Sequence, residues 1–238
     1  MPRTEQEYKA AREIYAELGI DTDQAIETLT SIPLSIHCWQ GDDVIGFDGA
    51  TSLSGGILST GSYPGRARNA EELRSDAAFA FSLIPGKKRF NLHAMYAETG
   101  GAKVDRCDIE PRHYEGWMEW AKQQHIGLDF NPTFFSHPLA ESGWTLAHPD
   151  NSIRDFWIRH GKASRRIAQS IADTLKDHVV NNLWVPDGYK DMPADRLGPR
   201  LRLKESLDAI YSEKLPNDRV LDSVESKLFG IGSEAYVA

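Results

Sequence analysis

The sequence predicts an α/β fold, a parallel (β/α)8 barrel of the TIM type that is incomplete, with about five of its eight strands present. Short apolar runs alternate with helical patterns, which is typical of a parallel sheet. Each run ends in polar or aromatic residues, and the carboxyl ends of parallel strands are where α/β active sites lie. A closed barrel has eight strands and about 250 residues. The 238-residue chain ends soon after its fifth run, so we expect a truncated barrel.

The five apolar runs are each followed by side chains suited to chemistry. They cover residues 34–36, 90–92, 127–128, 182–185 and 220–224. The polar or aromatic residues that follow them are 37–43, 93, 129–131, 186–188 and 225–227. If the strands are parallel, these five groups gather at one edge of the sheet.

Two helices are expected before the first strand. Tyr8, Tyr15 and Leu18 follow helical spacing up to Gly19, and Asp21 is suited to cap a second helix. We therefore interpret residues 1–30 as N-terminal flanking helices that cover the outside or the end of the barrel. Residues 31–238 are interpreted as the N-terminal portion of one barrel domain, because they contain no repeat and no linker.

The helices between the later strands have recognisable first turns. Asn69 with Glu72 resembles a capping box, Pro111 and Pro199 suit first turns, and an apolar stripe predicts a long helix over residues 152–175. The segment 41–65 is rich in Gly, Ser, Asp and Thr, and a loop of that length in a compact domain is usually a functional lid or a mobile segment.

Composition narrows the class of protein. The net charge is −8, with 40% hydrophobic and 26% charged residues, which suits a globular domain and argues against nucleic acid or an anionic membrane as a partner. No apolar run reaches the roughly 18 residues needed to cross a bilayer. Cys38 and Cys107 are too few for a disulfide framework, so a cytoplasmic location is expected.

Glu225 and Lys227 form the most specific short motif. Alternate residues of a strand face the same way, so both side chains would project into the mouth of the barrel. A carboxylate suits manganese or magnesium, and a nearby ammonium can polarise a substrate oxygen. For the tripeptide 225–227 taken alone, a solvated ion pair on an edge strand is the commoner explanation.

Other candidates have ordinary structural explanations beside the functional ones. His93 ends an apolar strand, where a lone histidine is more often a satisfied core residue than a catalyst. Trp184 and Asp187 could form an apolar and a polar wall for a sugar, although a tryptophan there is also an ordinary core filler. The segment 37–43 is interpreted as lining of the mouth and not as a zinc site, because His37 and Cys38 would point to opposite faces.

Several longer strings, taken together, resemble the N-terminal part of bacterial L-rhamnose isomerases, which are manganese-dependent aldose–ketose isomerases with a (β/α)8 barrel. The resemblance covers nearly the whole chain in unbroken order. The matching strings are SIHCWQGDDV (35–44), SGGILSTGSYPGRARNAEELRSD (54–76), NLHAMY (91–96), LDFNPTFFSHPLAESGWTLAH (128–148), SIRDFWIRHGKASRRI (152–167), NLWVPDGYKD (182–191), RLGPRLRL (196–203) and VESKLFGIGSEAY (224–236).

The resemblance implies roles for individual residues. Glu225 matches a carboxylate ligand of the metal that holds the substrate, and Lys227 matches a lysine near the carbonyl end of the sugar. His93 matches a histidine that contacts the ring-oxygen end. Trp39 and Trp184 match tryptophans that line the substrate pocket.

The resemblance also implies a mobile loop over about residues 46–63, near the deoxy end of the sugar. Phe47 and Leu53 are its candidate substrate-binding residues. The expected reaction interconverts L-rhamnose and L-rhamnulose, with a hydrogen transferred between C1 and C2 as a hydride or through an enediol. By the same resemblance we expect a homotetramer when the protein is full length.

The sequence departs from the family by lacking the remaining metal ligands, an Asp-x-x-His arrangement and further His and Asp residues that come from strands six to eight. One carboxylate cannot hold two divalent ions that each want about six ligands. We expect the 238-residue chain alone to be inactive and poorly soluble. The alternatives are an inactive fragment, or another sugar isomerase of the xylose-isomerase-like barrel superfamily.

Overall fold

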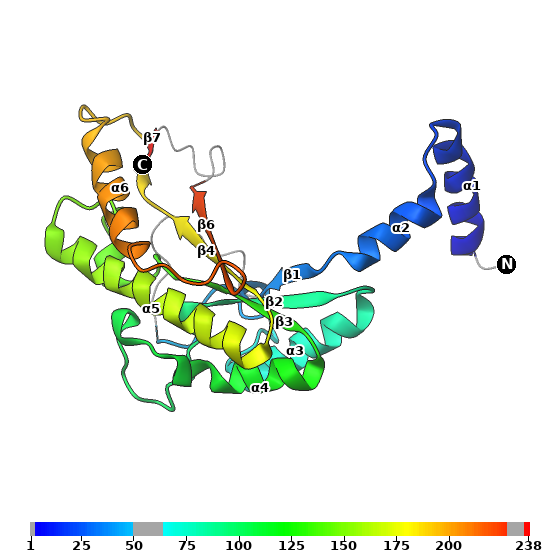
Figure 1. Ribbon diagram of the computed structural model, residues 1–238, viewed down its shortest axis with the longest axis horizontal. Coiled ribbons are helices and arrows are strands. Elements are labelled where there is room, and N and C mark those ends of the chain that lie inside the picture. Colours follow the sequence, from blue (N-terminus) through cyan, green and yellow to red (C-terminus); the bar gives the residue numbers. More distant parts are fainter. Residues whose placement is uncertain (1–2, 50–63, 228–235) are drawn as a thin grey trace.

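The computed structural model describes residues 3–49, 64–227 and 236–238 of the chain. Its centre is a five-stranded parallel sheet in the order β1-β2-β3-β4-β6 (Figure 1). The strands are β1 (Leu34–His37), β2 (Lys88–His93), β3 (Gly127–Asn131), β4 (Val179–Val185) and β6 (Val220–Ser226). The parallel α/β arrangement and its five strands are confirmed, and the sheet agrees with part of a barrel. The closed eight-stranded barrel stays a prediction.

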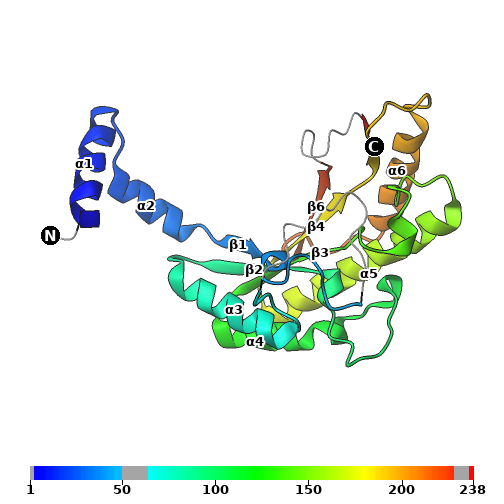
Figure 2. The same cartoon turned by 180° about the vertical axis from the view of Figure 1, so that it is seen from behind.

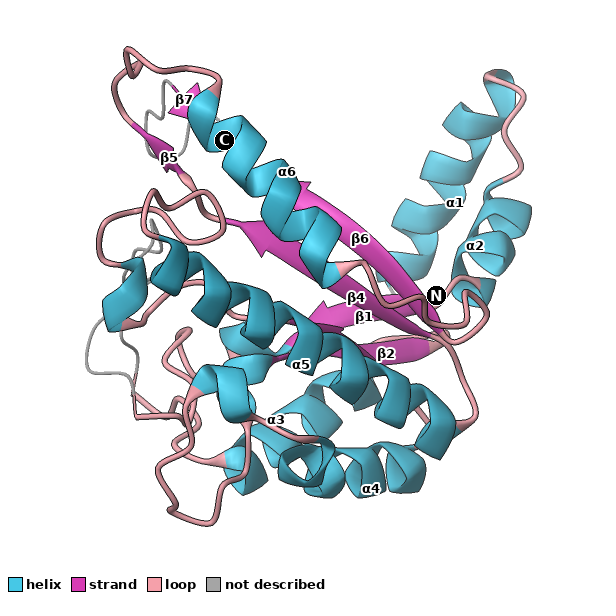
Figure 3. Cartoon of the chain, turned by 60° about the vertical axis from the view of Figure 1, so that its left-hand side comes forward, coloured by secondary structure: helices cyan, strands magenta, loops and turns pink. Residues whose placement is uncertain are grey.

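Four helices lie on one face of this sheet (Figure 3). They are α3 (Ala70–Leu83), α4 (Glu115–Gln124), α5 (Asn151–Leu175) and α6 (Gly198–Ile210). Strand alternation sends Phe90, Leu92, Leu128 and Phe130 toward the helices, where each is at most 2% exposed. The intervening side chains are polar and face the other way, which is the side that would be the interior if the sheet belongs to a barrel.

The helices begin where the sequence predicts caps. The side chain of Asn69 accepts a hydrogen bond from the backbone of Glu72, and that of Asp21 accepts from the backbones of Asp23 and Gln24. Pro111 lies in the first turn of a 3-10 helix that leads into α4. The 3-10 helices are η1 (Cys38–Gln40), η2 (Ala94–Tyr96), η3 (Arg106–Asp108), η4 (Pro111–Tyr114) and η5 (Pro138–Ala140).

Two strands begin earlier than the apolar runs predict, at Lys88 and at Val179. Polar residues in these extensions have hydrogen-bond partners in other strands. The guanidinium of Arg89 donates to both carboxylate oxygens of Asp129 at 3.0 Å, and Asn181 donates to Asp222 at 3.1 Å. A buried charge is tolerated when it is paired and hydrogen-bonded. The apolar runs alone therefore underestimated the length of these two strands.

The N-terminal helices α1 (Arg3–Glu17) and α2 (Thr22–Ser31) do not cover the sheet, contrary to expectation. No residue of either helix is buried, and both extend away from the strands (Figures 1 and 2). Ile14, Leu18 and Leu29 are 63%, 71% and 56% exposed. Their apolar sides have no cover within the described chain, so the helical periodicity was informative about the helices but not about where they pack.

A second, smaller sheet was not predicted. Strands β5 (Gly188–Tyr189) and β7 (Tyr236–Val237) pair in antiparallel fashion. Each has two residues, which is too short for a periodic pattern. Cys38 and Cys107 are free thiols, as expected. None of the helices in the described ranges combines the length and the apolarity that crossing a membrane requires.

Candidate functional site at the carboxyl edge of the sheet

The sheet brings together side chains from strands that lie far apart in the sequence. His37 ends β1, His93 ends β2, and Trp184 and Glu225 stand opposite each other near the ends of β4 and β6. Because all five strands are parallel, these positions share one edge. Burial lowers the pKa of His37, and the nearby charge of Glu225 partly opposes this effect. First and last strands are therefore close enough for their side chains to interact.

Trp39 stacks against two histidines. Its ring centroid is 4.6 Å from that of His37 and 4.7 Å from that of His93, with interplanar angles of 20° and 28°. The position follows from η1, which starts directly after β1 and turns the tryptophan back over the strand ends. Trp39 and His93, two of the predicted site residues, thus lie side by side in the structure.

Phe135 lies between His93 and Trp184. Its ring centroid is 6.0 Å from the His93 ring and 5.8 Å from the Trp184 ring, and its side chain is fully buried. We call Trp39, Phe135 and Trp184 the aromatic wall. Phe135 was not predicted, although its position shortly after the third strand was a signal that could have identified it.

His93 is an uncharged hydrogen-bonding group at this edge. Burial lowers its pKa to about 3, with further contributions from His37 and Arg106. Neither ring nitrogen has a hydrogen-bond partner among the described residues, although both are buried. Buried polar atoms in folded proteins normally have a partner, so this imidazole is free to accept from, or donate to, a ligand hydroxyl.

Glu225 has a defined orientation at the exposed edge of the sheet. The amide of Asn182 donates to Glu225 Oε2 at 2.8 Å, and Ser223 in turn donates to the amide oxygen of Asn182 at 2.8 Å. Alternation along β6 puts Ser223 and Glu225 on the same side of the strand. The carboxylate therefore points toward the interior side, as its predicted role requires.

The metal site is not complete in the described part of the chain. No group of three or more His, Cys, Asp or Glu side chains is arranged there to hold a metal ion. Glu225 offers one carboxylate, and one of its oxygens already accepts from Asn182. A manganese ion wants about six oxygen or nitrogen ligands, so these residues alone do not fit it.

The carboxylate of Asp187 is hydrogen-bonded to other groups of the protein. It is fully buried and accepts from the backbone and hydroxyl of Thr145 and from the backbone of Ala147, at 2.5–3.0 Å. Burial raises its pKa to about 6, against the hydrogen bonds and the positive charge of Lys227, which lower it. Lys227 thus lies near Asp187, and Asp187 connects the end of β4 to the loop before α5.

The loop after β1 is attached to the end of β2. The backbone of Phe47 donates to the carbonyl of Met95 at 2.8 Å, and the rings of Phe47 and Tyr96 meet edge to face at 5.2 Å. The carboxylate of Asp42 accepts from the Tyr96 hydroxyl at 2.6 Å. Leu53, the other predicted residue of this loop, lies outside the described residues.

Comparison with known proteins supports the sequence resemblance. A family model described as L-rhamnose isomerase (RhaA) matches residues 3–238. The chain is 53% identical over 234 residues to an L-rhamnose isomerase of Rhodopirellula baltica, covering 98% of this chain and 55% of that protein. It is 54% identical over 232 residues to one of Listeria monocytogenes serotype 4a, with 96% and 54% coverage. A relative in Salmonella paratyphi B is 54% identical over 233 residues, with 98% and 55% coverage. The chain spans about half the length of these curated relatives.

Proposed function

This chain belongs to the L-rhamnose isomerase family, and we propose that it supplies about half of the active site of an enzyme that interconverts L-rhamnose and L-rhamnulose. The observation that carries the proposal is the convergence of His93, Trp39, Trp184 and Glu225 at one edge of a parallel sheet. An apolar wall with a few convergent polar groups is the usual form of a small-molecule site.

The side chains divide the work of binding and catalysis. The aromatic wall packs against the C–H faces of the sugar, and neutral His93 exchanges a hydrogen bond with the oxygen at the ring end. Lys227 places a positive charge near the sugar oxygen on which negative charge develops while hydrogen moves between C1 and C2. Phe47 and Leu53 are proposed to contact the deoxy end from the loop after β1.

We further propose manganese as the metal and Glu225 as one of its ligands. The remaining ligands, and the strands that close the barrel, would come from the half of the relatives' length that this chain does not match. A homotetramer in the cytoplasm is the proposed state of the complete protein. These proposals follow from the family resemblance, and they concern the complete protein rather than this chain alone.

The test compares two aldoses in the complete protein that carries this chain. L-Rhamnose and L-mannose differ by one hydroxyl at C6, so they report on the apolar end of the pocket. Ketose is measured with saturating manganese, and we expect L-rhamnose to have the higher kcat/KM. One hydroxyl or methyl in an apolar pocket changes specificity by only about 10- to 200-fold. Turnover of other aldoses but not of L-rhamnose would indicate a different sugar isomerase, and no turnover at all would indicate an inactive protein.

A further inference from the structure

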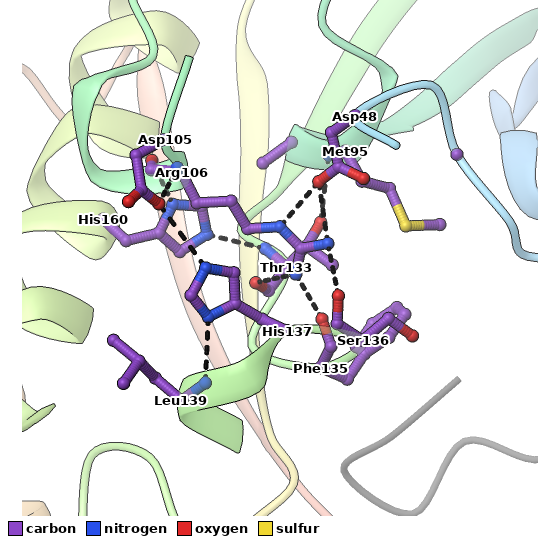
Figure 4. Close-up of polar contacts among 12 residues, drawn as sticks. Asp48, Met95, Asp105, Arg106, Thr133, Phe135, Ser136, His137, Leu139 and His160 are labelled. Carbon is purple, nitrogen blue, oxygen red and sulfur yellow. Dashed lines mark hydrogen bonds and ion pairs between the residues drawn. The ribbon is translucent and has the colours of Figure 1, made fainter. Parts of the chain in front are cut away.

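Arg106 contacts the segment that carries Phe135 and connects two of the loops that form the site. It is the first residue of η3, and its side chain is 4% exposed. Figure 4 shows its polar contacts. Nε and Nη2 both lie 2.8 Å from Oδ2 of Asp48. Nη1 donates to the carbonyls of Thr133, at 3.1 Å, and Phe135, while Nη2 donates to that of Ser136 at 3.1 Å.

These contacts use the full shape of a guanidinium group. Arginine has five N–H donors in a rigid plane, and the atoms of Arg106 are directed at one carboxylate oxygen and three carbonyls. A lysine has three donors on one nitrogen and cannot reach all four acceptors at once. Replacement of Arg106 by lysine would therefore keep the charge but leave some of these carbonyls unsatisfied.

The main chain of Arg106 is attached to the same strand end. Nε2 of His160 accepts from the backbone N–H of Thr133 at 2.9 Å, so the ring proton is on Nδ1. Nδ1 then donates to the carbonyl of Arg106 at 2.8 Å. Both the backbone and the side chain of Arg106 thus fix the segment that leaves β3.

This segment carries the central ring of the aromatic wall. Phe135 offers its carbonyl to Arg106 and its ring to His93 and Trp184. On the other side of the guanidinium, Asp48 directly follows Phe47. One buried cation therefore fixes the wall and the start of the loop after β1 relative to each other.

We propose that Arg106 is a positioning residue of the sugar site, which fixes Phe135 between His93 and Trp184 through the carbonyls after β3 and through Asp48. The inference rests on the proposed sugar-isomerase function for its substrate. Arg106 is 4% exposed and its donors are used by Asp48 and by the carbonyls after β3, so it acts through these groups rather than on the sugar itself. Its effect is on the width of the pocket and hence on how well the sugar is bound.

The test uses the complete protein that carries this chain, with variants Arg106→Lys and Asp48→Asn. Arg165→Lys is the matched control, because Arg165 is also buried and pairs with Asp222 and with the carbonyls of Ile210 and Glu213, so its contacts are with β6 and the end of α6 rather than with the segment 133–136. Each variant is measured for thermal stability, manganese content, KM and kcat with L-rhamnose. The 19F NMR signal of Phe135 is recorded in protein labelled with fluorophenylalanine and is assigned from its loss in Phe135→Leu.

In Arg106→Lys we expect the Phe135 signal to shift or broaden and KM to rise about tenfold, which corresponds to about 1.4 kcal/mol. Manganese content should stay unchanged and kcat should fall less than KM rises. Asp48→Asn should change both readouts in the same direction by a smaller factor, and it serves if Arg106→Lys does not fold. Arg165→Lys should lose stability with KM and the Phe135 signal unchanged. A Phe135 signal that is unaltered in both site variants, or a KM change equal to that of the control, would overturn the proposal. If the wild-type protein binds no sugar while the Phe135 signal still shifts, the proposed function fails and the positioning of the wall stands.

Discussion

The hydroxyl of Thr145 donates to Oδ1 of Asp187 across 2.5 Å, between a loop and the end of a strand that are 42 residues apart. The same carboxylate accepts from the backbone N–H groups of Thr145 and Ala147. Both oxygens of Asp187 are therefore used within the protein. This geometry makes its predicted contact with the sugar directly testable.

Asp187→Asn is expected to affect stability more than sugar binding. The new NH2 group faces donors instead of accepting from them, and leaving a buried donor unsatisfied costs about 1–3 kcal/mol. We expect the free energy of unfolding to fall by this amount, measured by urea denaturation, with KM for L-rhamnose unchanged. Asp191→Asn, at an exposed position, is the control. A raised KM at unchanged stability would show that Asp187 binds substrate.

Because His160 is buried, we expect the protein to lose stability in acid. Burial lowers its pKa to about 3 from the ordinary value of 6.5. Between these two pH values the unfolded state binds more protons than the folded state, so the free energy of unfolding falls as the pH is lowered through this window. One such group contributes a slope of about 1.4 kcal/mol per pH unit, and His93 contributes in the same direction.

His160→Gln should remove one proton from this linkage while keeping one donor and one acceptor. The measurement is urea denaturation at several pH values from about 4.5 to about 6.5, a range that lies between the folded-state and the ordinary pKa of His160. Phe134→Leu is the control, because its ring lies 5.3 Å from that of His160 and does not titrate. An identical slope in the His160→Gln variant and the wild-type protein would contradict the assignment.

The sequence predicted the helices and strands better than the contacts that the irregular segments between them make. Apolar runs identified all five parallel strands of the described chain, and since such strands end at one edge, the placement of Trp39, His93 and Trp184 near that edge followed from the order of the elements. Phe135 and Arg106 were missed because they lie in irregular segments, where no periodicity exists. Arg106 reaches Asp48 from 58 residues away, and only the folded chain reveals such a contact.

Glu225→Gln is expected to remove tight metal binding and activity together in the complete protein. The amide has no negative charge and half the acceptor capacity of the carboxylate, while its shape is nearly the same. The hydrogen bond from Asn182 can be kept by the remaining oxygen, so the fold should be little affected. Manganese is measured by elemental analysis after dialysis, with the exposed Glu205→Gln as control. An unchanged manganese content would show that Glu225 is not a metal ligand.

Lys227→Met distinguishes the role of the lysine from that of Glu225. If the ammonium stabilises charge on the sugar oxygen, its loss should lower kcat roughly 100- to 1,000-fold, as when one oxyanion donor is removed. Metal content should stay intact, because an ammonium has no lone pair to donate to a cation. Lys227 also lies near Asp187, whose pKa its charge lowers, so a purely structural role would instead appear as reduced stability with kcat nearly unchanged. The two cases are separated by measuring kcat at saturating manganese beside the exposed Lys190→Met control. A decrease in kcat smaller than about fivefold, well below the electrostatic expectation, would make Lys227 a structural partner of Asp187.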